Sequence, residues 1–261
     1  MGHSTNLVGI PTGLLASTAF NEHPLPLAIA GVRETNRALF RMLADAGDTA
    51  EAMEAFQGYM RAVFGLEETQ RVPGRPRRFR ASYVRLLQGW GFDANGPEGA
   101  VLKGWAESRF GLLPTFHREP LGRYPSAAWM TYVEQKMSGR FHTNSIHAQL
   151  DLLYEYGQWM LARWLAPARR HVRLYRGVND FREHTIVERP ARRELVVRQN
   201  NVVSFTARRS LADTFGDTIV EADVPVVKVL FCNGLLPGSV LRGEGEYLVI
   251  GGDYRVRLAY L

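Results

Sequence analysis

Residues 167–178 read PARRHVRLYRGV, and the character of the sequence changes within this stretch. Pro167 disfavours continuation of a helix, and the residues that follow it mix apolar and charged side chains as a half-buried strand does. Short runs of the same kind continue almost to the C-terminus. They predict strands at 171–175, 194–198, 202–206, 226–231, 247–250 and 254–260.

Before Pro167 the apolar residues recur at helical spacing. This pattern extends from about residue 26 to residue 165 and predicts a series of helices. Asn144 or Ser145 is placed to cap the last of these helices, since both residue types accept hydrogen bonds from the first helical N–H groups.

The order of these elements predicts the fold class. Strands gathered behind a block of helices favour an α+β fold over alternating βαβ units. A Rossmann domain is disfavoured as well, because no G-x-G-x-x-G motif follows a predicted strand. We expect a mainly helical region over residues 1–166, packed on a β-rich region over residues 167–261, and the two can form one compact unit.

Composition narrows the classes of partner. The net charge of +6 favours acidic partners, which include phosphate-bearing ligands, nucleic acid and acidic protein surfaces. Cys232 is the only cysteine, so an internal disulfide and a multi-cysteine metal site are excluded. The apolar residues that precede Cys232 predict that its thiol is buried.

The N-terminal segment predicts no export signal. Residues 7–19 lack a preceding basic stretch and are interrupted by Pro11 and Gly13, unlike a signal peptide. No apolar run approaches the length of a transmembrane helix. With the single cysteine, these features predict a cytoplasmic protein.

The first candidate site residue is Arg176, which follows Tyr175 at the end of a predicted strand and precedes Gly177. The planar guanidinium of arginine can bind a phosphate or a ribose where glycine leaves room beside the backbone. A surface arginine in a turn has the same local sequence, so this motif alone indicates no ligand site.

The second candidate is the Ser-Phe-Thr motif at residues 204–206. Side chains alternate along a strand, so the hydroxyls of Ser204 and Thr206 lie on one face and Phe205 on the other. The two hydroxyls can line a cleft while Phe205 joins the core. A polar strand face in water fits the same pattern.

The third candidate is the pair Glu244 and Glu246, which follows a loop and precedes a predicted strand. Strand alternation places the two carboxylates side by side. Like charges at that distance are costly unless a cation lies near them, and such arrangements are frequent at functional sites. The alternative is a solvated acidic turn in which Arg242 pairs with one of them.

Together the three motifs resemble the R-S-E signature of arginine-specific ADP-ribosyltransferases, with Arg176, Ser204 and Glu244-x-Glu246 in the expected order. The resemblance extends over the whole chain. The segments 2–11 (GHSTNLVGIP) and 174–178 (LYRGV) look like the nitrogenase-regulating branch of this superfamily.

This resemblance implies a split mixed β-sandwich with NAD, the ADP-ribose donor, in the cleft between its sheets. It implies that Glu246 holds the 2′-hydroxyl of the nicotinamide ribose and stabilises the positive charge that develops on this ribose. Glu244 would position or deprotonate the incoming guanidinium. Arg176, with its neighbours Tyr175 and Gly177, would bind phosphate or ribose. Ser204 and Thr206 would hold the nicotinamide end. Many members have Ser-Thr-Ser in the middle motif, so the role of Phe205 is open. No metal is required.

The resemblance also implies the partners. The protein substrate would be dinitrogenase reductase, and a PII-type signalling protein would be the regulator. Two alternatives stay open: an ADP-ribosyltransferase or NAD glycohydrolase with another target, and a basic protein that binds without catalysing. Failure to bind NAD, as measured by calorimetry, would support the second alternative.

The basic run at residues 75–80 and the histidines predict no specific ligand site. The basic run RPRRFR at residues 75–80 favours a solvated loop or the docking of an acidic protein over nucleic acid. The histidines show no spacing of metal ligands, and a structural or surface role is expected for His117, His142, His147, His171 and His184.

Overall fold

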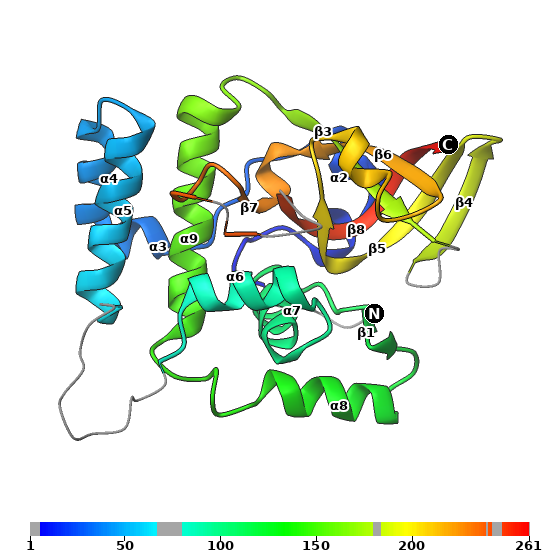
Figure 1. Ribbon diagram of the computed structural model, residues 1–261, viewed down its shortest axis with the longest axis horizontal. Helices are drawn as coiled ribbons and strands as arrows, with labels where there is room; N and C mark the ends of the chain where they lie inside the picture. Colours follow the sequence, from blue (N-terminus) through cyan, green and yellow to red (C-terminus); the bar gives the residue numbers. More distant parts are fainter. Residues whose placement is uncertain (1–5, 67–79, 180–183, 239, 242–246, 261) are drawn as a thin grey trace.

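The computed structural model describes residues 6–66, 80–179, 184–238, 240–241 and 247–260. A block of helices precedes an antiparallel sheet, which confirms the α+β class. In Figure 1 the sheet lies at the upper right, with helices beside and below it. None of the described helices is long and apolar enough to cross a membrane.

The helix α9 (Ile146–Met160) lies between α5 and the sheet and contacts both (Figure 1). Its Glu155 is fully buried and accepts hydrogen bonds from the N–H of Ile29 and from Arg33, which joins the N-terminal segment to α9. The other helices before the sheet are α1 (Thr12–Leu15), α2 (Thr18–Glu22), α3 (Val32–Thr35), α4 (Arg37–Asp45), α5 (Thr49–Phe64), α6 (Tyr83–Phe92), α7 (Pro97–Phe110) and α8 (Ala127–Lys136), and a π-helical turn (Leu161–Leu165) follows α9.

The predicted side-chain cap of α9 is wrong. Ser145 occupies the N-cap position, but neither its hydroxyl nor the Asn144 side chain caps the helix. Both residues have positive φ, whereas a capping side chain requires an extended backbone.

The helix α7 was not predicted separately, because it has no apolar stripe. It is buried on nearly every side, and small residues such as Gly99 and Ala100 allow its neighbours to approach closely. Its ends do follow the usual rules: Pro97 opens the helix and Gly111 ends it in the left-handed conformation.

The sheet has the strand order β3-β6-β8-β5-β4, and β7 pairs with β8. Every described pair is antiparallel, so the expectation of a mixed sheet is wrong. Parallel pairs usually arise from βαβ units, whereas here the long helices precede the strands in the chain. The strands are β3 (His171–Val178), β4 (Thr185–Ala191), β5 (Glu194–Phe205), β6 (Thr218–Pro225), β7 (Val229–Cys232) and β8 (Tyr247–Tyr260), and short elements elsewhere are β1 (Phe116–His117), β2 (Glu119–Pro120), α10 (Arg209–Ala212) and a 3₁₀ turn (Val226–Lys228).

Two long strands replace four predicted short ones. β5 joins the two predicted strands around a bulge between Gln199 and Val202, and β8 joins the last two around Gly251 and Gly252. The irregularities face each other: a Cβ on Gly251 would lie 1.6 Å from the carbonyl oxygen of Asn200. Glycine at this position therefore lets the two strands pass each other closely where both depart from regular pairing.

The strands β4 and β6 were missed. β4 is an edge strand whose residues are mostly exposed and include Pro190, so it has no clear apolar alternation. The predicted strand at 226–231 is wrong in its first half, where residues Val226–Lys228 form the 3₁₀ turn.

Two hydrophobic cores lie on the two faces of the sheet. Val202 and Ile250 pack into the larger core, which also contains the helices, whereas Val203, Phe205 and Tyr254 belong to a second core formed among the strands. The prediction that Phe205 joins the core is confirmed, since Phe205 is buried in the second core, on the face opposite Val202.

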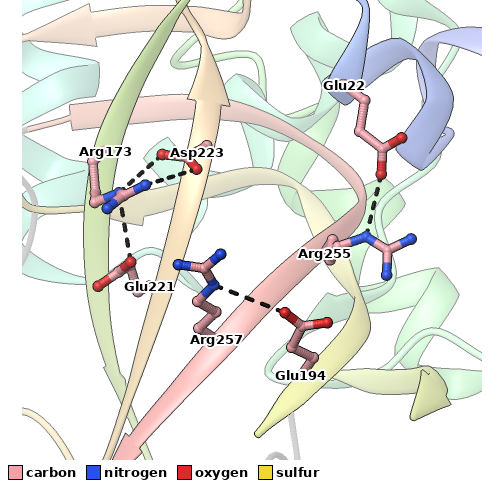
Figure 2. A network of polar contacts seen from close by, with 7 residues as sticks. All are labelled: Glu22, Arg173, Glu194, Glu221, Asp223, Arg255 and Arg257. Atoms are coloured by element: carbon pink, nitrogen blue, oxygen red, sulfur yellow. Dashed lines mark hydrogen bonds and ion pairs between the residues drawn. The ribbon is translucent and has the colours of Figure 1, made fainter. Parts of the chain in front are cut away.

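Charged pairs on the exposed strand faces match the register. Figure 2 shows Arg173 of β3 reaching Asp223 and Glu221 of β6, and Arg257 of β8 near Glu194 of β5. Arg173 and Asp223 are directly opposite in the ladder, as are Glu194 and Arg257. Opposite charges at paired positions favour this register over a slip by one residue, although each exposed pair contributes little to stability.

Candidate active site

A cavity of about 260 Å³ lies where the end of α6 meets β3 and β5. Arg176 and Ser204, the first two motif residues, both line it. The lining residues are Trp90, Gly91, Phe92, Asp93, Ala94, Asn95, Lys103, Phe116, Arg176, His184, Asn200, Val202, Val203, Ser204 and Leu241.

Arg176 is half-buried on the face of β3 that also carries Leu174 and Val178. Its guanidinium donates a hydrogen bond of 3.0 Å to the backbone oxygen of Ser204 in β5. This contact connects the arginine and serine motifs directly and holds a planar cation at the wall of the cavity.

Ser204 is held from the helical side of the cavity. The indole N–H of Trp90 in α6 donates to the Ser204 hydroxyl at 2.8 Å, and both side chains are buried. Trp90 falls within the stretch of helical periodicity at residues 26–165, but that periodicity predicted no partner for the indole N–H. A buried tryptophan normally has such a partner, and this rule was the available signal.

A second buried cation forms another part of the wall. Lys103 of α7 is fully buried and donates to the Asn95 side chain and to the backbone oxygen of Phe116, both at 3.0 Å. His117 lies 3.3 Å from the Lys103 ammonium, and burial lowers the pKa of His117 to about 4, although a hydrogen bond with Gln135 opposes that shift. A neutral His117 can accept from Lys103, so the structural role expected for this histidine is confirmed.

His184 lines the cavity beside Arg176, although the sequence indicated only a structural or surface role for it. It is 9% exposed, and its Nδ1 atom is buried with no hydrogen-bond partner among the residues that the structure describes. Burial, and then the charge of Arg176, lower its pKa to about 3, so the imidazole is neutral at ordinary pH. No spacing rule in the sequence relates His184 to Arg176, because the two meet only in the folded chain.

The bulge of β5 ties the cavity to the helical region. Asn200 lines the cavity and bonds the backbone of Thr115 and Phe116, while Asn201 donates to the backbone oxygens of Lys103 and Leu112. Side-chain amides thus replace the strand pairing that the bulge removes. The helical region and the sheet are joined next to the cavity.

Three predicted site residues lie near the cavity without lining it. Tyr175 and Thr206 exchange two backbone hydrogen bonds of 2.8 Å, which join β3 to the end of β5, and the Thr206 hydroxyl accepts from the N–H of Arg208. Gly177 packs against α10, where a Cβ would lie 2.1 Å from the carbonyl oxygen of Ala212. Their roles in ligand binding stay predictions.

Glu244 and Glu246 lie outside the described residues, as do the first five residues of the basic run at 75–80 and residues 2–5 of the N-terminal motif. Their described neighbours can be placed. Leu241 lines the cavity, and Tyr247 pairs with Phe205 in the ladder of β8 and β5.

Cys232 and three other histidines lie outside the lining of the cavity. Cys232 is buried as predicted, and burial raises the pKa of its thiol to about 12. His171 contacts the backbone oxygen of Asn21, and the rings of His142 and His147 lie 6.0 Å apart. Among the described residues no group of three or more histidine, cysteine or acidic side chains is arranged to hold a metal ion.

Comparison with known proteins gives two matches. The family described as dinitrogenase reductase ADP-ribosyltransferase matches residues 5–258. The NAD(+)-dinitrogen-reductase ADP-D-ribosyltransferase of Rhodospirillum rubrum is 60% identical over 266 residues, covering 100% of this chain and 96% of its own length. No solved structure matches the chain.

Proposed function

The chain belongs to the dinitrogenase reductase ADP-ribosyltransferase family, and on this basis we propose that it transfers ADP-ribose from NAD to an arginine of dinitrogenase reductase. This is a mono-ADP-ribosylation that inactivates nitrogenase reversibly. The observation that carries the assignment within the structure is the convergence of Arg176 and Ser204 on one cavity.

The cavity suits the donor. Arg176 and Lys103 supply positive charge for a pyrophosphate, and Ser204 supplies a hydroxyl whose position is fixed by Trp90. The neutral imidazole of His184 adds a polar group beside Arg176. We propose that Arg176 binds phosphate or ribose and that Ser204 positions the nicotinamide end, with Tyr175, Gly177 and Thr206 supporting these two residues from the flanking backbone.

Glu246 acts on the sugar. Cleavage of the bond between nicotinamide and ribose develops positive charge on the ribose, as in glycoside hydrolysis. A carboxylate at that position stabilises the cation and holds the 2′-hydroxyl. The placement of Leu241 on the cavity wall and of Tyr247 opposite Phe205 supports this role, because these residues flank the glutamate motif in the chain.

Glu244 acts on the acceptor. The arginine side chain is protonated at neutral pH and is a poor nucleophile, so it must lose a proton as its nitrogen bonds the ribose carbon. Glu244 orients the guanidinium and accepts that proton while nicotinamide leaves. No covalent intermediate with the protein is needed.

Replacing Glu246 with Gln tests the donor chemistry. The amide keeps the size of the side chain but cannot stabilise the cation by charge, so we expect transfer to fall by about 100-fold or more. The affinity for NAD should change little. Initial rates of label transfer and calorimetric titration with NAD measure the two quantities. Transfer by Glu246→Gln at the unmodified rate would contradict the role of Glu246.

Glu244→Gln is the matched variant. It should remove arginine modification and leave part of the NAD hydrolysis, because water needs less orientation than a guanidinium. Equal loss of both activities would show that the two glutamates do not divide the reaction in this way.

The substrate is tested separately. Labelled NAD is incubated with the protein, with and without dinitrogenase reductase, and label on the reductase is the expected result. Hydrolysis of NAD without labelling would favour the glycohydrolase alternative. Failure to bind NAD would favour a non-catalytic basic protein.

Three finer features belong to the same proposal. The long strands β5 and β8, each contributing to both cores, support a split sandwich of the ADP-ribosyltransferase kind. A PII-type protein is proposed as the regulator, testable by co-purification with this chain. A cytoplasmic location is proposed from the single cysteine, which suits a reducing compartment.

A further inference from the structure

The rim of the cavity carries an aromatic ring that packs on almost nothing. Phe92, the last residue of α6, is 94% exposed and yet belongs to the cavity lining. Other exposed large hydrophobic side chains on the described surface are less exposed, the next being Tyr124 at 65%. A phenyl ring held in water at the mouth of a cavity offers a face for a flat ligand.

Asp93 follows Phe92 directly and shares the rim. It is exposed, and one oxygen of its carboxylate accepts from the N–H of Asn95 at 2.8 Å, which orients the side chain within its turn. Asp93 is the one carboxylate among the described lining residues. It therefore provides a negative charge at the opening.

Charge divides the cavity into two parts. The wall contains Arg176 and Lys103, which attract the phosphates of NAD and repel any second cation. Among the described lining residues, Asp93 is the one that attracts a guanidinium arriving from solvent, and it lies beside the aromatic face of Phe92. The two substrates of the proposed reaction have opposite charge, and the two parts of the cavity match them.

We propose that Phe92 and Asp93 form the entry site for the arginine side chain that accepts ADP-ribose. The planar guanidinium stacks on the Phe92 ring and pairs with the Asp93 carboxylate, two modes of recognition for which arginine is better suited than lysine. This inference rests on the proposed function. It adds a recognition site on α6, in the helical region, to the motif residues of the sheet.

The test distinguishes an effect on binding of the acceptor arginine from an effect on binding of NAD. We compare Phe92→Ala, Phe92→Tyr and Asp93→Asn with the unmodified protein, measuring transfer to dinitrogenase reductase, NAD hydrolysis without acceptor, and NAD affinity by calorimetry. Asparagine keeps the oxygen that accepts from Asn95, so the turn is preserved. Cation–π contacts and exposed ion pairs are each weak, so we expect Phe92→Ala and Asp93→Asn to raise the KM for the acceptor about three- to tenfold. Phe92→Tyr should restore it.

Matched controls identify nonspecific effects. Leu113→Ala removes another exposed apolar side chain, and Asp45→Asn neutralises an exposed acid of α4, both outside the cavity lining. Both should behave like the unmodified protein. The inference would be overturned if Phe92→Ala weakened NAD binding, or if it lowered NAD hydrolysis as much as it lowers transfer. An unchanged KM for the acceptor would overturn it as well. If the unmodified protein neither hydrolyses NAD nor transfers ADP-ribose, the proposed function itself fails and the inference fails with it.

Discussion

Trp90 shows how one residue can serve both the core and the site. Its ring belongs to the larger core, while its N–H fixes the Ser204 hydroxyl. Trp90→Phe keeps an aromatic ring and removes the hydrogen bond. Because the buried hydroxyl of Ser204 then loses its donor, we expect the free energy of unfolding to fall by about 1–3 kcal/mol. NAD affinity, measured by calorimetry, should fall several-fold.

Trp105→Phe is the control for this change. Trp105 is also buried and donates its N–H to Asp151 at 2.7 Å, but it does not line the cavity. Its replacement should lower stability and leave NAD affinity unchanged. If the two variants affect NAD affinity equally, Trp90 has no specific part in positioning Ser204.

At the level of elements, the facing irregularities of β5 and β8 depend on glycine. A side chain at Gly251 would collide with the backbone of Asn200, which cannot move without breaking the contacts of the bulge. We expect Gly251→Ala to lower the free energy of unfolding by about 3 kcal/mol or more, as measured by urea denaturation.

Gly58→Ala provides the comparison. Gly58 lies within α5, and a Cβ there would meet nothing within 4 Å. Alanine should stabilise this helix by about 0.5–1 kcal/mol. A Gly251→Ala variant as stable as the unmodified protein would show that the close approach of β5 and β8 is not required.

A buried lysine of the 3₁₀ turn Val226–Lys228 contacts this bend of β8 and makes stability depend on pH. Lys228 is fully buried and donates to the backbone oxygen of Gly251, with the rings of Phe20 and Tyr254 nearby. Burial lowers its pKa from 10.5 to about 7, against the opposing charge of Asp253. Below about pH 7 the folded protein must hold a buried charge that the unfolded chain exposes to water.

Between pH 7 and 10.5 the unfolded chain holds the proton that the folded protein has released, so the contribution of Lys228 to stability rises with pH. We expect the stability of Lys228→Met relative to the unmodified protein to be highest below pH 7 and to decrease at about pH 9. Urea denaturation at about pH 6 and about pH 9 measures this difference. A difference independent of pH would contradict the shifted pKa.

At the level of the whole molecule, the helical region and the sheet share the larger core. Val202, Leu248 and Ile250 of the sheet pack with residues of α5, α6 and α9 in one cluster. We therefore propose that residues 1–166 and 167–261 unfold together, in one transition with equal calorimetric and van't Hoff enthalpies. A fragment of residues 167–261 should not fold alone, because that face of its sheet would be exposed. Two separate thermal transitions would contradict this.

The sequence by itself determined the fold class, the burial of Phe205 and the burial of Cys232. These properties depend on local periodicity and on apolar neighbours, which are visible along the chain. The sequence motifs also identified Arg176 and Ser204, and the structure brings both to one cavity.

Only the tertiary structure decided the rest. It joined predicted strands across a bulge and two glycines, placed His184 beside Arg176, gave Trp90 its partner in β5 and left Phe92 exposed at the rim. These relations connect residues far apart in the chain, and no spacing rule describes them. The physical reason is that packing of the helical region on the sheet, and not the local pattern, sets which side chains meet and which surface stays open.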